Sequence, residues 1–535
     1  MEKRLFYILF SLLLIIPLTG FQSEQSEIEQ KIMFHAQKFK YLLETAYKNY
    51  IDTVDIDKIS DAAYKAMLNE LDPFSVYNPP EKQKQVDNRS KGSSEGIGIE
   101  IAVLNDTAYI YSVIEGSPAD SAGIKTGDKA LFIDGSNIAG MSKNEIMNKI
   151  AGQSGTALSL IVRRGNTSSL QEYRIMRQKV EIKSLDAAFV IPETNIAYIK
   201  YNRFSEISHK EFDEVKKKLK KEGAKSVILD FRGNPGGYLE EIVKIADEFI
   251  PEGYKITYTK ARNKEFLVDY NSTPGGGFES APVVLLLDNQ SSSGSEMIAG
   301  ALQDIDRGLV VGEPSFGKGV AQSQWKLADG SGFRLTVASY YTPSGRCIQK
   351  LQTNEKPLFD PSFYLNLNSS TQKMVEDMLA KNGNMTQLPI YKSSKGRNLI
   401  GGGGIFPDYF VKNDTLTLLT KVLEQKGFIL EYIYDYLSSA RGQIERKYKA
   451  DFLKFSSNFD VNDEMLESLR RLSYQKNTWN DAMYIQDKEY IRALIKAGIA
   501  NALWGSSGYY SVMLINDKQV QKAIEVMHEA GEMLR

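Results

Sequence analysis

The sequence predicts an α/β protein that contains a small β-rich domain and has helical regions at both ends. Apolar runs alternate with amphipathic stretches over residues 182–411, which is the order of elements in βαβ units. Short β runs broken by glycine-rich turns fill residues 92–181. Apolar residues recur at helical spacing over residues 23–91 and 412–535. These patterns predict four consecutive domains behind a short N-terminal segment.

Residues 1–22 have the order of an export signal. Lys3 and Arg4 precede an apolar run over residues 5–18, which is too short for a comfortable membrane span. We therefore expect the chain to be exported to a bacterial periplasm. The alternative is an uncleaved membrane anchor, because small residues suited to cleavage are poorly placed after the run.

The next region, residues 23–91, is predicted to be helical. Ile32, Phe39 and Leu42 recur at the spacing of one helix face. The Asn78-Pro79-Pro80 segment is expected to end the helices, because proline disrupts a helix interior.

Residues 92–181 contain β runs at 108–113, 129–133 and 158–163, and one helix near 142–150. The region also contains four short motifs, in the order Gly116-Ser117-Pro118-Ala119, Ala122-Gly123-Ile124, Gly127-Asp128 and Ile133-Asp134-Gly135. Together these marks resemble a PDZ domain of the permuted bacterial kind.

A PDZ domain implies that a peptide C-terminus adds a strand to the sheet while backbone N–H groups hold its carboxylate. The candidate loop for this role is Glu95-Gly96-Ile97-Gly98. Ile97, Ile99 and Ile101 are expected to supply apolar side chains around the peptide groove. The alternative is that the two glycines only form a turn.

Residues 182–411 are predicted to form the α/β core. Strands are expected at 195–201, 226–231, 283–288 and 309–312, and helices at 208–221, 238–249 and 295–305. Residues 351–400 lack strong periodicity and are predicted to be an insertion, and residues 412–535 a separate helical domain.

The composition disfavours several classes of function. A net charge of −1 gives no basis for nucleic-acid binding, and the basic run at 216–221 is expected to be the exposed face of a helix. Cys347 is the single cysteine, which rules out an intrachain disulfide and a four-cysteine zinc site. The three histidines are isolated in the sequence, so we predict neither a metal nor another cofactor.

A serine cluster at 291–293 follows the apolar run at 283–288 and precedes a helix. A serine in that position is most often an N-cap, but a helix N-terminus also suits a developing oxyanion. No histidine lies near enough in sequence to complete a Ser-His-Asp triad. Lys318, between two glycines, is the available base, and a lysine serves as a base only where its surroundings lower its pKa. The alternative is an exposed loop lysine.

A nucleotide-binding alternative arises because residues 312–319 nearly match a phosphate-binding P-loop. Gly319 stands where the P-loop requires serine or threonine. Residues 320–341 also read as a β-hairpin, whereas a P-loop opens a helix. Both departures disfavour this interpretation.

Taken as a set, several motifs are similar to those of the carboxy-terminal processing peptidases, a family of Ser–Lys peptidases with a PDZ domain. The motifs lie at residues 229–237, 291–296, 312–319, 341–346 and 404–408. The resemblance covers roughly residues 30–411. It implies a crotonase/Clp-like ββα peptidase core with an inserted PDZ domain and helical N- and C-terminal regions.

The resemblance implies roles for three side chains. Ser293 falls on the nucleophile of the family and Lys318 on its general base. Gln322 falls on the third member, which could orient the lysine amine, since positions four apart on a strand share a face. Asp304 is expected to support the site.

The oxyanion hole implied by the resemblance uses the backbone N–H of Gly294 and of either Gly236 or Gly237. The family has alanines where this chain has Ser292 and Gly294, and Gly294 is expected to loosen the start of the helix.

The function implied is an exported serine endopeptidase that cuts proteins near their C-termini. Its partners would be protein or peptide substrates with free C-termini, docked by the PDZ domain, and no nucleic acid. The resemblance also leaves room for a homodimer through the helical regions and for an adaptor protein. The alternative function is a non-catalytic PDZ scaffold with an inactive peptidase fold.

Overall fold

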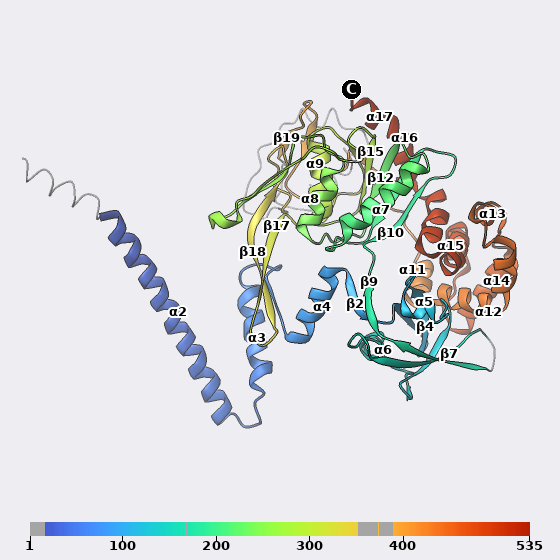
Figure 1. Cartoon of the computed structure of the whole chain (residues 1–535), viewed down its shortest axis with the longest axis horizontal. Coiled ribbons are helices and arrows are strands. Elements are labelled where there is room, and N and C mark those ends of the chain that lie inside the picture. Colours follow the sequence, from blue (N-terminus) through green and yellow to red (C-terminus); the bar gives the residue numbers. More distant parts are fainter. Residues whose placement is uncertain (1–15, 166–168, 351–372, 374–388) are drawn as a thin grey trace, which may run out of the picture. The chain divides into compact units, whose positions relative to one another are not determined.

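A computed structural model describes residues 16–165, 169–350, 373 and 389–535 (Figure 1). The chain divides into two compact units. One comprises Met1–Glu81 with Gln324–Leu335, and the other comprises Lys82–Ser323 with Thr336–Arg535.

The first unit is built on helices, as the sequence predicts. It contains α2 (Ile16–Asn49), α3 (Ile56–Asn69) and β1 (Val76–Asn78), which runs antiparallel to the first residues of β18 (Gly332–Tyr341). Helix α2 begins inside the predicted export signal, while residues 1–15 lie outside the described residues. None of the helices in the described ranges has both the length and the apolar character needed to cross a membrane.

The segment around Pro80 differs from its prediction. Asn78 ends strand β1, and Pro80 begins a further helix, α4 (Pro80–Lys91). A proline is tolerated in the first turn because its missing N–H would have no intrahelical acceptor there. The expectation that this segment ends the helical region is therefore wrong.

The predicted PDZ domain is present in the second unit. Its sheet has the order β3-β4-β5-β7-β8, with β6 beside β5, and a separate pair joins β2 to β9. The strands are β2 (Ser93–Gly96), β3 (Ile99–Leu104), β4 (Thr107–Val113), β5 (Lys129–Ile133), β6 (Ser136–Asn137), β7 (Ala157–Arg163), β8 (Leu170–Met176) and β9 (Gln178–Glu181); the helices are α5 (Pro118–Ser121) and α6 (Lys143–Ile150). The sequence does not reveal β8, because its side chains are largely exposed and form no apolar run.

The predicted peptidase core is a six-stranded sheet of order β10-β11-β12-β15-β16-β21. All neighbours are parallel except β10 and β11. The elements are β10 (Leu185–Val190), β11 (Ile196–Tyr201), α7 (Ser208–Lys221), β12 (Ser226–Asp230), α8 (Leu239–Asp247), β15 (Val283–Leu287), α9 (Gly294–Asp304), β16 (Leu309–Gly312) and β21 (Tyr409–Phe410). The central strands are buried on both faces, which explains their continuous apolar runs.

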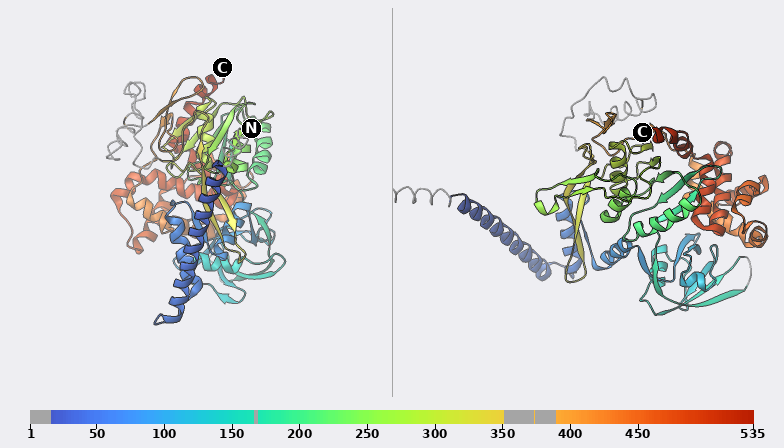
Figure 2. Two further views of the ribbon diagram at one scale, coloured as in Figure 1. Left: turned by 90° about the vertical axis from the view of Figure 1, so that its left-hand side faces the viewer. Right: turned by 45° about the horizontal axis from the view of Figure 1, so that its top comes forward.

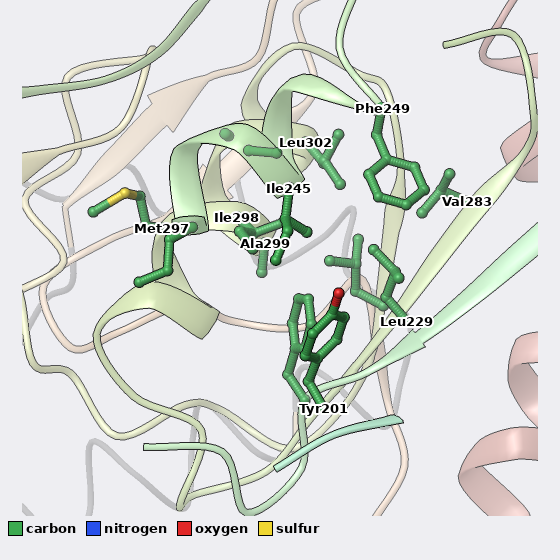
Figure 3. Packing of buried hydrophobic residues seen from close by; sticks show 14 of the residues in the cluster. Tyr201, Leu229, Ile245, Phe249, Val283, Met297, Ile298, Ala299 and Leu302 are labelled. Atoms are coloured by element: carbon green, nitrogen blue, oxygen red, sulfur yellow. The ribbon is translucent and has the colours of Figure 1, made fainter. Parts of the chain in front are cut away.

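Helices cover both faces of this sheet. On one face, Ile245 of α8 and Ile298 and Leu302 of α9 pack toward Leu229 and Tyr201 of the strands (Figure 3). On the other face the C-terminal helices form a second cluster with Ile228, Val284 and Leu286, to which they contribute Leu514, Val520, Ala523 and Val526. The C-terminal end accordingly lies beside the core strands in each view (Figure 1 and Figure 2). Part of the predicted C-terminal helical domain thus completes the peptidase core.

The remaining C-terminal helices pack around a core of their own, to which Leu104 and Tyr109 of the PDZ domain also contribute. The helices after the core are α11 (Leu418–Gln425), α12 (Phe428–Tyr448), α13 (Phe452–Asn458), α14 (Asp463–Gln475), α15 (Asp481–Met513), α16 (Lys518–Glu525) and α17 (Met527–Glu532). Most of the predicted insertion lies outside the described residues, and its end forms the pair β19 (Ile390–Lys392) and β20 (Asn398–Ile400).

Candidate active site

Ser293 lies at the turn between β15 and α9. Its backbone has φ 56° and ψ −110°, a conformation that residues with a side chain rarely adopt. It occupies the N-cap position of α9, where its own backbone N–H donates to the Glu296 side chain. Such strained residues tend to mark functional sites. The geometry thus disfavours the interpretation that Ser293 is an ordinary N-cap.

The turn is held by hydrogen bonds to the glycine-rich loop at 232–237. The carboxylate of Asp288 accepts from the backbone N–H of Ser291 at 3.0 Å and of Gly233 at 2.9 Å. The backbone N–H of Ser292 donates to the carbonyl of Asn234 at 3.0 Å. The serine turn and the glycine-rich loop therefore form one connected structure.

Glu296, in the first turn of α9, connects the two predicted catalytic residues. Its Oε2 accepts from the backbone N–H of Ser293 at 2.7 Å and of Lys318 at 2.9 Å. Its Oε1 accepts from the Ser315 hydroxyl at 2.5 Å and the Gly317 N–H at 2.6 Å. One buried carboxylate thus fixes the backbone of the serine and the backbone of the lysine relative to each other.

Burial raises the pKa of Glu296 to about 7, although all four of these donors act in the opposite direction. Glu296 is not among the site residues predicted from the sequence. A signal was available, because serine followed three residues later by glutamate is the pattern of a capping box.

Lys318 belongs to the loop between β16 and β17 (Val320–Lys326). Its Nζ donates to Oε1 of Gln322 at 3.0 Å, so the predicted contact between these two side chains is present. The loop leads into a strand that pairs with β18, not into a helix. The P-loop alternative is therefore wrong, because a P-loop places its phosphate at a helix N-terminus.

The hydrogen bonds distinguish the two candidate glycines of the oxyanion hole, Gly236 and Gly237. The N–H of Gly236 donates to the Asn234 side chain at 2.8 Å and is already occupied. Gly237 lies opposite Phe204 in a β-bridge whose hydrogen bonds are made by the residues on either side of it, Gly236 and Tyr238. The N–H of Gly237 has no acceptor among the described residues. The N–H of Gly294 likewise has none there. Gly237 and Gly294 are therefore the better pair of donors.

The substitution of the family's alanine by Gly294 has a packing reason. A Cβ atom added at this position would lie 2.2 Å from Cδ1 of Ile242 in α8. Gly294 thus allows α8 and α9 to approach closely, so it contributes to packing at the helix start.

Asp304 lies at the far end of α9 and is not part of the site. Its carboxylate pairs with the buried Arg346 and accepts from the backbone N–H of Ser344 at 2.8 Å. Its support is therefore structural and acts on the turn at 344–346.

The candidate peptide loop of the PDZ domain is shorter than predicted. Glu95 and Gly96 belong to strand β2, paired with β9, so only Ile97 and Gly98 lie between strands. Their carbonyl groups accept from Ala119 and Ile114, each at 2.9 Å. The side chains of Ile97, Ile99 and Ile101 belong to the core of the domain, which contradicts their predicted place around an open groove.

One group of described residues could hold a metal ion, namely His209, Asp213 and Glu248. The Lys216 ammonium already lies among them, 2.7 Å from Asp213 and 2.8 Å from Glu248. Burial would raise the pKa of Glu248, but hydrogen bonds from His209 and Lys216 lower it to about 2. We interpret the group as an ion-pair network.

Comparisons with known proteins assign families to three parts of the chain. The sequence profile of "Peptidase family S41" matches residues 195–355, that of the "PDZ domain" matches residues 85–163, and a "Family of unknown function (DUF8443)" matches residues 419–505.

Curated relatives match over much of their length. A carboxy-terminal-processing protease of Bartonella bacilliformis is 32% identical over 332 residues, which is 61% of this chain and 76% of the relative. The carboxy-terminal processing protease CtpA of Bacillus subtilis is 32% identical over 65% of this chain and 75% of the relative. A solved structure, a photosystem II D1 C-terminal processing protease, is 25% identical over 58% of this chain and 83% of that chain, with a TM-score of 0.33.

Proposed function

This chain belongs to peptidase family S41, the carboxy-terminal processing proteases, and from that premise we propose that it cleaves exported proteins near their C-termini with Ser293 as nucleophile and Lys318 as base. The observation that carries the proposal is the Glu296 carboxylate, which accepts from the backbone N–H groups of both residues. The hydrogen bond from Lys318 to Gln322 supports the same assignment.

In the proposed mechanism the Ser293 hydroxyl attacks the scissile carbonyl carbon while the Lys318 amine accepts its proton. The oxygen that becomes negative is held by the N–H groups of Gly237 and Gly294, and the start of α9 adds a favourable dipole. Lys318 then returns the proton to the leaving amine. Lys318 then takes a proton from a water molecule, whose oxygen attacks the acyl carbon. The bond between that carbon and the Ser293 oxygen breaks, and the lysine returns the proton to Ser293.

A fluorophosphonate probe tests the nucleophile directly. The wild-type chain should be labelled and the Ser293→Ala variant should not. Sequencing the termini of products from a mixture of envelope proteins tests the cleavage position. Absence of labelling in the intact chain would favour the alternative of an inactive peptidase fold that serves as a PDZ scaffold.

We also propose that the PDZ domain holds the substrate C-terminus. Strand β3 lies at the edge of its sheet, so it can accept an added strand. The carbonyl groups of Ile97 and Gly98 turn into the domain. Because the peptide bond is planar and trans, the N–H groups of Gly98 and Ile99 point the opposite way and are suited to a carboxylate.

Amidating the C-terminus of a substrate should therefore lower kcat/KM by roughly tenfold, the scale of one charge-assisted hydrogen bond of about 1.5–3 kcal/mol. The measurement compares the acid and amide forms of one peptide. A peptide whose cleavage site is kept but whose C-terminal residues are scrambled serves as control. Equal rates for the acid and amide forms would contradict docking of the terminus.

Export rests on the order of Lys3, Arg4 and the apolar run at 5–18, and we propose a periplasmic location on that basis. N-terminal sequencing of the protein recovered from fractionated cells tests both the location and the cleavage of the signal. Recovery in the cytoplasmic fraction with an intact N-terminus would contradict it.

A second copy of the chain is the proposed partner of helix α2. This helix has 34 residues and carries exposed apolar side chains, among them Ile28, Ile32 and Phe34. Helices of soluble proteins gain most of their stability by packing such a face. Light scattering of the full chain should give twice the 60.1 kDa of one chain. The Ile28→Glu/Ile32→Glu variant should give a monomer, whereas Lys38→Glu on the same helix should leave the dimer unchanged. A monomeric wild type would contradict the proposal.

A further inference from the structure

The C-terminal helices reach the loop that contains Gly237, one of the two proposed oxyanion donors. Nη1 of Arg232 donates to Oδ2 of Asp517 at 2.7 Å and to Oε1 of Gln519 at 3.0 Å. Arg232 follows strand β12 and opens the loop at 232–237, which contains Gly237. Asp517 and Gln519 lie at the start of α16, 285 and 287 residues later in the chain.

The rest of the Arg232 side chain is fixed within the core. Its Nε and Nη2 donate to the fully buried carboxylate of Asp230, at 3.0 and 2.6 Å. Burial alone would raise the pKa of Asp230, but Arg232 and Lys200 hold it well below its usual range, so the pair is charged. The planar guanidinium is thereby oriented with Nη1 toward α16.

The partner side chains on α16 are equally constrained. Oδ1 of Asp517 caps the helix by accepting from the backbone N–H of Gln519 and Val520, which leaves Oδ2 for Arg232. Gln519 is almost fully buried, and its Nε2 donates to the carbonyl of Val411 at 2.7 Å. The backbone N–H of Val411 in turn donates to the carbonyl of Gly312. The loop that contains Lys318 begins after Gly312.

The loop is therefore held from two sides. The Arg232 side chain is held by α16, and the Lys200 ammonium donates to the carbonyl of Arg232. The next residue, Gly233, donates its N–H to Asp288 of the serine turn at 2.9 Å. A displacement of Arg232 would be transmitted to this loop, since Gly233, Asn234 and Gly236 are tied to one another and to the core by hydrogen bonds.

We propose that Asp517 and Gln519 are positioning residues of the peptidase, which act through Arg232 to aim the N–H of Gly237 at the oxyanion. This gives the C-terminal helices a part in catalysis in addition to their packing on the sheet. The inference rests on the proposed function, because it assigns an effect to the oxyanion hole of that reaction.

The test is Asp517→Asn, which keeps an N-cap residue but presents a neutral amide to Arg232. We expect kcat to fall about tenfold and KM to change less than about twofold, the pattern of an interaction made in the transition state. A peptide aldehyde forms a hemiacetal with the serine, whose oxygen occupies the oxyanion site. Its affinity should fall by the same factor as kcat.

A second change provides rescue. In the Asp517→Glu variant a carboxylate again faces Arg232 while Gln519 keeps its bond to Val411, and kcat and aldehyde affinity should stay close to the wild-type values. Lys518→Ala, between the two residues but exposed to solvent, is the matched control and should behave as wild type. If Asp517→Asn does not fold, Gln519→Met removes one acceptor of Arg232 with little change in volume and carries the same expectation.

The proposal is overturned if kcat is unchanged in these variants. It is equally overturned if KM rises while aldehyde affinity stays at the wild-type value, since that pattern indicates general loosening of the fold. Cleavage by the wild type that is lost in Ser293→Ala establishes the proposed function whatever the α16 variants do, so the two failures are distinguishable.

Discussion

Replacing Lys318 with alanine is expected to lower kcat/KM for peptide cleavage by at least about 10³-fold while the chain stays folded. Without the amine, the proposed acceptor for the proton of the Ser293 hydroxyl is lost, and a neutral hydroxyl is a weak nucleophile. Lys318→Arg should be equally inactive, because a guanidinium does not release its proton at working pH. The measurement is a fluorogenic peptide assay, with circular dichroism to check the fold.

Lys326 provides a matched control for this experiment. It is an exposed lysine on strand β17, the strand that follows the Lys318 loop, so Lys326→Ala should retain wild-type activity. Ser293→Ala sets the background rate. If Lys318→Ala kept a tenth or more of the wild-type rate above that background, the Ser–Lys mechanism would have to be abandoned.

Replacing Glu296 with glutamine is expected to lower kcat by about 10²-fold or more. The carboxylate accepts four hydrogen bonds, including those from the backbone of Ser293 and Lys318. Glutamine keeps one acceptor oxygen and turns an NH₂ group toward the remaining donors. Small displacements of reacting groups cost about 10²-fold in rate. Unsatisfied buried donors should also lower the free energy of unfolding by about 2–4 kcal/mol.

The pH dependence gives Glu296 a distinct signature. Its pKa is raised from 4.5 to about 7, so its contribution to stability is present below pH 4.5 and is lost as pH rises through about 7. Activity should change in the opposite direction, because only the carboxylate can accept all four donors. The wild type should thus gain activity, and lose this part of its stability, between pH 4.5 and about 7.

The glutamine variant should lack this titration in both measurements. Glu313→Gln changes a half-buried carboxylate at the start of the loop that contains Lys318 and is the matched control, with both titrations kept. Thermal unfolding and kcat measured across this pH range on the three proteins provide the comparison. Parallel pH profiles in wild type and Glu296→Gln would assign the titration to another group.

Much of the architecture could be predicted from the sequence, because buried strands and buried helix faces produce local patterns of apolar residues. Strands buried on both faces read as apolar runs, and helix α7 has the bounds predicted from its period, Ser208–Lys221. The strand-then-serine and glycine-flanked lysine patterns singled out Ser293 and Lys318 as candidates. The family resemblance implied that Gln322 lies beside Lys318, and the structure contains that contact, although Lys318 lies in the loop before β17.

Other features depend on contacts between segments that are far apart in the sequence, and local patterns do not predict such contacts. The choice of Gly237 over Gly236 depends on which N–H the Asn234 side chain occupies. The covering of the core sheet by α16 and α17, and the bond from Asp517 to Arg232, join segments almost three hundred residues apart. Periodicity fixes which face of an element is buried, but the partner on that face is decided by the path of the whole chain. The sequence by itself therefore determined most of the elements and the candidate reactive side chains, and only the tertiary structure decided what holds them in place.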